Sequence, residues 1–282
     1  MPDILSLTAD EKLVRLNVKL EWAKKHFSKL QAVSERFLTT DPKPYAVGFD
    51  HDSQPGQTLI YLLKDAEPTP TEIGLLAGDV AHNLRSVLDH LAYYLWVVGT
   101  NGKGIPGRKR PFGKAYFPIA DDANEYQTSG VGKVEGMTDD AKKAVAETEP
   151  YYGGKGHIFW LLNQLDIADK HHTLVTSDIR PLSMNMDFAR FPIRARYPGM
   201  NQGFVLRYAR FGNFTFPGFR TSAKAGDVII SYESKTYKDV QPTFDIAFSE
   251  PQVIEGKSVL ITLQYAIDAI DNLLPKFRPL LV

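Results

Sequence analysis

Residues 73–102 carry only three charged side chains, those of Asp79, Arg85 and Asp89. The whole chain is 23% charged, so about seven would be expected over this length. Apolar residues recur here at helical spacing, at Ile73, Leu76, Val80, Leu84, Leu88, Leu91 and Leu95. We therefore expect a long central helix over about residues 70–98, covered on several sides by the rest of the chain.

Three other segments have the pattern of long helices: residues 8–39, 157–176 and 258–274. The first opens with the capping-box spacing of Thr8 and Glu11, and the last ends before Pro275. Residues 186–254 change to short apolar runs separated by Gly, Pro and Asn. Residues 45–49 and 58–63 also look like short strands, and residues 138–149 like a short helix. We predict one α+β domain over residues 1–282, in which a four-helix bundle core, residues 8–185 and 255–282, carries a small antiparallel β-rich insertion at 186–254.

Composition excludes several classes of function. The 33 basic residues balance the 33 acidic ones, so any contact with nucleic acid has to be local. The absence of cysteine excludes disulfides, thiolate metal sites and cysteine nucleophiles, and suits a reducing compartment. No apolar run approaches the roughly eighteen residues of a membrane span, and the first ten residues lack the pattern of an export signal. We expect a cytoplasmic protein with no membrane contact.

The polar residues of the central helix gather on one arc, opposite its apolar stripe. Because lysine is absent from this arc, it does not have the composition of an ordinary solvated face. Neighbours three or four residues apart can share a hydrogen-bonded network, so we expect something polar to cover the arc. Its members are Asp79, His82, Asn83, Ser86, Asp89 and His90.

The helix at 157–176 has a second polar group on its apolar side. Asp166, Asp169 and His172 project toward the direction of its apolar residues, while Lys170 and His171 lie at the flank. A buried carboxylate is costly unless a cation or hydrogen-bond donors meet it. We expect Arg85 to meet Asp166 or Asp169, so that the two helices share one sheltered polar site.

Arg85 and His90 are separated by four residues on a predicted helix, and this Arg-x4-His pattern resembles the motif of HEPN nucleases. The resemblance implies a homodimer that cuts RNA at a shared cleft, without metal, by attack of the RNA's own 2′-hydroxyl. Arg85 would then stabilise phosphate charge and His90 would transfer the proton. Such a toxin or defence endoribonuclease would also imply a neutralising partner protein.

A larger part of the chain resembles a loose group of uncharacterised bacterial proteins. The shared pattern is His-Asn-x-Arg-Ser-x-x-Asp-His-Leu at residues 82–91, Phe-Pro-Ile at 117–119, Pro-Tyr at 150–151 and Asp-Lys-His at 169–171. This resemblance spans roughly residues 80–175 and implies no established activity.

A metal site is an alternative, in which the two helices supply nitrogen and oxygen ligands to Zn, Mn or Fe in a hydrolase. The candidate ligands are His82, Asp89, His90, Asp166, Asp169 and His172.

A further alternative is a non-catalytic helical scaffold or binding protein that needs no cofactor. Arg85 would then pair with Asp89 or Asp169, and the polar residues would only fix how the helices pair. Because the central helix has so little surface charge, we expect a homodimer to cover it.

Overall fold

The computed structural model divides the chain into two compact units. The first contains residues 1–31, 74–175 and 260–282, and the second contains residues 32–73 and 176–259. The described residues are 4–50, 58–171, 177–186, 193–195, 204–206, 212–215, 225–226, 228–232, 242–249 and 257–282. Whether the two units form one domain, as the sequence predicts, stays a prediction.

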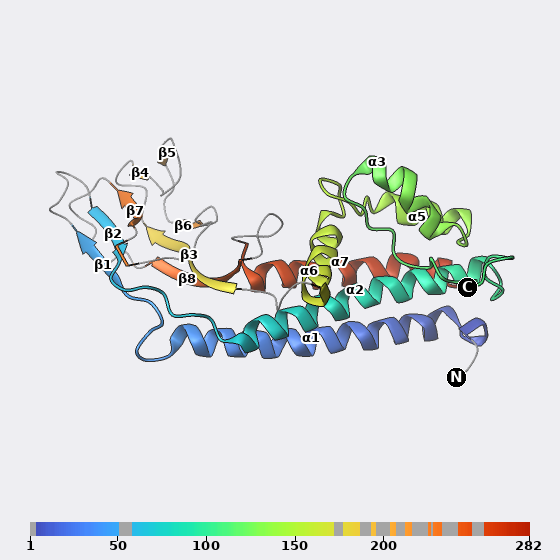
Figure 1. Ribbon diagram of the computed structural model, residues 1–282, viewed down its shortest axis with the longest axis horizontal. Helices are drawn as coiled ribbons and strands as arrows, with labels where there is room; N and C mark the ends of the chain where they lie inside the picture. Colours follow the sequence, from blue (N-terminus) through green and yellow to red (C-terminus); the bar gives the residue numbers. More distant parts are fainter. Residues whose placement is uncertain are drawn as a thin grey trace. The chain divides into compact units, whose positions relative to one another are not determined.

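Long helices form the core of the first unit (Figure 1). They are α1 (Ala9–Thr39), α2 (Thr71–Gly99), α6 (His157–His171) and α7 (Val259–Phe277), which confirms a helix-rich mixed fold. Their facing sides bury apolar residues at helical spacing, including Leu16, Leu20, Leu84, Leu88, Leu263 and Ile270. Among the described residues, no helix is long and apolar enough to cross a membrane.

The predicted capping box starts α1. The backbone N–H of Glu11 donates to Thr8 Oγ1 at 3.2 Å, and the backbone N–H of Thr8 donates to Glu11 Oε2 at 2.8 Å. These two bonds satisfy donors that the first turn of a helix leaves unpaired, which explains why α1 begins here.

The prediction that Pro275 ends the last helix is wrong, because α7 continues through it to Phe277. Leu274, Phe277 and Leu281 are buried, so packing holds the chain in helical form beyond the proline. A 3₁₀ turn, η3 (Arg278–Leu280), follows, and Lys12 of α1 donates its Nζ to the Leu281 carbonyl at 2.8 Å.

Short helices cover part of α2. They are α3 (Ala123–Glu125), the π-helix η2 (Tyr126–Gly130), α4 (Val131–Val134) and α5 (Asp139–Glu147), and a 3₁₀ turn η1 (Ile4–Ser6) precedes α1. Asp122 caps α3, and Thr138 caps the predicted α5 by accepting from Ala141 at 3.3 Å. Trp96 of α2 donates its indole N–H to the Lys133 carbonyl at 2.6 Å, and this hydrogen bond links α4 to α2.

The second unit holds the strands, and all the strand pairs that the structure describes are antiparallel, as predicted. They form sheets of order β1-β2-β7, β6-β3-β8 and β4-β5. The bounds are β1 (Val47–Asp50), β2 (Thr58–Leu62), β3 (Ser177–Met186), β4 (Ile193–Ala195), β5 (Phe204–Leu206), β6 (Gly212–Thr215), β7 (Val228–Tyr232) and β8 (Pro242–Phe248).

Strands also form outside residues 186–254. Strand β3 begins at Ser177, before the predicted insertion, and it contains Pro181 at an irregularity in its pairing with β8. The hairpin of β1 and β2, which precedes α2 in the chain, joins β7 of the predicted insertion. The strands of one sheet therefore come from segments both before and after α2 in the sequence.

Candidate functional site

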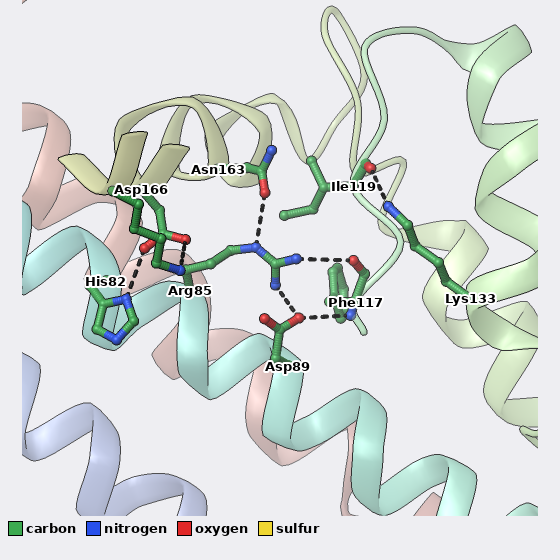
Figure 2. Close-up of polar contacts among 9 residues, drawn as sticks. His82, Arg85, Asp89, Phe117, Ile119, Lys133, Asn163 and Asp166 are labelled. Carbon is green, nitrogen blue, oxygen red and sulfur yellow. Dashed lines mark hydrogen bonds and ion pairs between the residues drawn. The ribbon is translucent and has the colours of Figure 1, made fainter. Parts of the chain in front are cut away.

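Arg85 lies at the centre of a polar cluster between α2 and α6 and is only 8% exposed. Its Nε donates to Asn163 Oδ1 at 3.0 Å, its Nη1 donates to Asp89 one helical turn further on, and its Nη2 donates to the Phe117 carbonyl at 3.4 Å (Figure 2). All three guanidinium nitrogens therefore have partners inside the protein.

Asp89 completes this cluster by holding the segment that precedes the short helices. Its Oδ1 accepts both from Arg85 and from the backbone N–H of Phe117, the latter at 3.0 Å (Figure 2). The Phe117 ring is fully buried and packs edge-on against Phe159, with the ring centroids 6.0 Å apart. Both backbone polar groups of Phe117 are thus bound to side chains of α2.

Lys133 approaches the same segment from α4 and donates its Nζ to the Ile119 carbonyl at 3.2 Å (Figure 2). Burial lowers the pKa of Lys133, and the nearby positive charge of Arg85 lowers it further. Neither Lys133 nor Asn163 was among the residues predicted to form the site. Asn163 had one available signal, since it precedes Asp166 by three residues and so shares its helix face.

A second cluster surrounds the buried carboxylate of Asp166. Its Oδ1 lies 2.9 Å from His82 Nδ1, and its Oδ2 accepts from Lys170 Nζ at 2.7 Å. The expectation of a cation for this carboxylate is correct, but the cation is Lys170 and not Arg85. Lys170 lies one turn away on the same helix and reaches Asp166 while part of its side chain stays in solvent.

Asp169 also lies against α2, close to the backbone of Gly78. A β-carbon at position 78 would come within 2.2 Å of Asp169 Oδ1, so a larger residue there would force the carboxylate to move. Burial raises the pKa of Asp169, and the carboxylates of Asp79 and Asp166 raise it further.

The other predicted members of the polar arc do not join these clusters. Asp79 is exposed and lies 3.4 Å from His26 Nδ1 of α1, a pairing that the sequence did not suggest. Asn83 is buried but donates to the backbone carbonyl of Asp79 in its own helix, at 2.7 Å. Ser86 is half-buried, and its side chain makes no hydrogen bond with any other residue that the structure describes. The single network predicted for the arc is therefore divided.

His90 borders a groove of about 730 Å³ at the side of α2 next to α1. The groove is lined by Val14, Arg15, Asn17, Val18, Lys19, Glu21, Trp22, Lys25, His90 and Tyr94. Desolvation lowers the pKa of His90, and Lys19 lowers it further, while Asp89 opposes the shift. Arg85 is not among the lining residues, so the groove does not bring the two residues of the Arg-x4-His pattern together.

Among the candidate metal ligands that the structure describes, only His82 and Asp166 are in direct contact. Within the described part of the chain, no group of three or more His, Asp or Glu side chains is arranged to hold a metal ion. The side chain of His171, and the whole of His172, lie outside the described residues.

No protein-family model, curated protein or solved structure matches this chain significantly.

Proposed function

We propose that the chain is a non-catalytic helical scaffold protein, in which Arg85 is a structural residue. The observation that carries this proposal is that all three nitrogens of its buried guanidinium donate to protein acceptors. Two N–H groups of the guanidinium remain beside these three bonds, but the side chain is only 9% exposed, so a phosphate could reach them only by displacing the protein packed around Arg85. Arg85 instead joins α2, α6 and the segment at Phe117.

The scaffold proposal is tested by measuring stability and RNA cleavage on the same variants. Arg85→Ala and Asn163→Leu should both lower the free energy of unfolding, since each removes one side of the same hydrogen bond. Purified wild-type protein should leave single-stranded RNA intact in EDTA. Cleavage that Arg85→Ala abolishes while the melting temperature stays unchanged would contradict the scaffold.

A metal-independent endoribonuclease of the HEPN type is a second candidate, and the surroundings of His90 favour it. His90 is exposed beside Arg15, Lys19 and Lys25, which supply positive charge near a titratable group. A lowered pKa favours the neutral imidazole, the form in which it accepts a proton from a 2′-hydroxyl. In this version the groove cations, and not Arg85, would contact the phosphate.

The nuclease candidate predicts RNA products with 2′,3′-cyclic phosphate ends, formed in EDTA. His90→Ala should abolish this cleavage without loss of stability, because His90 is exposed. Arg15→Ala should weaken RNA binding, whereas Lys142→Ala on α5, away from the groove, should not. Wild-type protein that leaves RNA uncut would remove this candidate and leave the scaffold intact.

A further inference from the structure

The outward face of α1 carries an apolar ridge that the first unit leaves uncovered. Val14, Val18 and Trp22 are spaced four residues apart and are 60%, 66% and 52% exposed. Apolar residues on a solvated helix face are usually scattered, and a ridge of three consecutive ones marks an interaction surface. Most of α2, by contrast, is already buried within its own unit, so the reason for expecting a homodimer through that helix no longer holds.

Two charged residues of this ridge, Glu11 and Lys25, complement each other in a reversed copy. At 100° per residue, Glu11, Val18 and Lys25 lie within about 20° of one line along the helix. An antiparallel copy centred on Val18 would place Glu11 opposite Lys25 and Val18 opposite Val18. A parallel copy would instead place each charged residue opposite its own like charge. Charge complementarity therefore favours the antiparallel arrangement.

One carboxylate oxygen of Glu11 is available for such a contact. The cap of α1 uses only Oε2 of Glu11, and no residue that the structure describes bonds to its Oε1. Arg15 and Trp22 lie on one flank, where a reversed copy places the Arg15 guanidinium near the partner's indole ring. The Trp22 ring already accepts a cation in this way, since Lys25 Nζ lies 5.7 Å from its centroid.

We propose that a second copy of this chain packs antiparallel on the outward face of α1, with the two-fold axis beside Val18. The homodimer is thereby assigned to α1 and not to the central helix. The dimer does not depend on the Arg85 cluster, since Val14, Val18 and Trp22 take no part in it. These three residues do line the groove beside His90, so the second copy would pack against the site of the nuclease candidate.

The absence of cysteine from the chain makes the geometry directly testable. At the axis, two Val18→Cys side chains would lie within disulfide reach, whereas two Val14→Cys residues would be separated by about 12 Å along the helices. Air oxidation should therefore cross-link Val18→Cys to a covalent dimer and leave Val14→Cys as single chains. Cross-linking of both variants indicates parallel packing and overturns the proposal, as does cross-linking of neither or of Val14→Cys alone.

Sedimentation of the uncross-linked protein gives the second arm of the test. Wild-type protein should sediment at twice the mass of one chain at micromolar concentration, and Glu11→Gln, which keeps an oxygen acceptor for the cap, should raise the dissociation constant at least tenfold. Lys142→Gln, an exposed control on α5, should leave it unchanged. Wild-type protein that sediments as single chains, or a dimer indifferent to Glu11→Gln, would overturn the proposal.

Discussion

Arg85 and Asp89, one turn apart on α2, together bind both the carbonyl and the N–H of a single residue, Phe117. The pair therefore does more than satisfy its own charges. It fixes the segment that leads into the short helices, and through Asn163 it also fixes α6. Loss of either side chain should therefore weaken the packing of α2, of α6 and of the segment at Phe117.

Arg85→Ala should lower the free energy of unfolding by about 3 kcal/mol, because it leaves a partly buried carboxylate without its cation. Urea denaturation followed by circular dichroism measures this directly. The ion pair of Lys142 with Asp139 is exposed, so Lys142→Ala should change stability by no more than about 0.5 kcal/mol. An Arg85→Ala protein as stable as that control would show that the cluster is not structural.

Gly78→Ala should destabilise the protein, although alanine in a helix is ordinarily better than glycine by about 1 kcal/mol. The reason is that the added β-carbon would meet the Asp169 carboxylate at 2.2 Å. In an Asp169→Ala background the same substitution should become stabilising. Gly132→Ala, where the nearest atom is a lysine Nζ at 3.8 Å, serves as the uncrowded control.

Asp169→Asn should make the stability of the protein depend less on pH in the acidic range. A raised carboxylate pKa means that the folded protein holds this proton more tightly than the unfolded chain. The contribution is fully present below the unfolded pKa of about 3.8 and is lost as pH rises through the higher folded pKa. Above that range the asparagine variant should be the more stable protein. Equal profiles for the two proteins from pH 3 to 7, by thermal melting, would argue against burial of this carboxylate.

Lys12→Met should show the opposite dependence in alkali. Burial lowers the pKa of Lys12, so the folded protein binds this proton less tightly than the unfolded chain, whose value is about 10.5. The free energy of unfolding of the wild type should therefore rise relative to that of the variant as pH increases toward 10.5. The other lysines titrate in both proteins, so the difference between the two free energies reports on Lys12 alone. A constant difference between the two would exclude a buried ammonium at this position.

The long helices and the Arg85–Asp89 pair could be predicted because both follow from spacing along one helix. The partner of Asp166 was predicted wrongly because Arg85 on another helix was expected, although Lys170 lies four residues away on the same helix. The roles of Phe117 and Lys133 could not be predicted from the sequence. They depend on backbone atoms of the segment at residues 117–119, and helical spacing does not predict where that segment lies. Helix spacing placed His90 on the polar arc of the central helix, but it could not show that His90 borders a groove beside α1.

Because the contacts at Phe117 are made to its peptide groups, this anchor does not depend on the identity of the side chain there. In diverging descendants of this chain, position 117 should accept any residue except proline that fits the space beside Phe159, whereas positions 85 and 89 should change only together. Covariation of positions 85 and 89 would then reveal the contact with the Phe117 peptide groups even in sequences whose neighbouring residues differ.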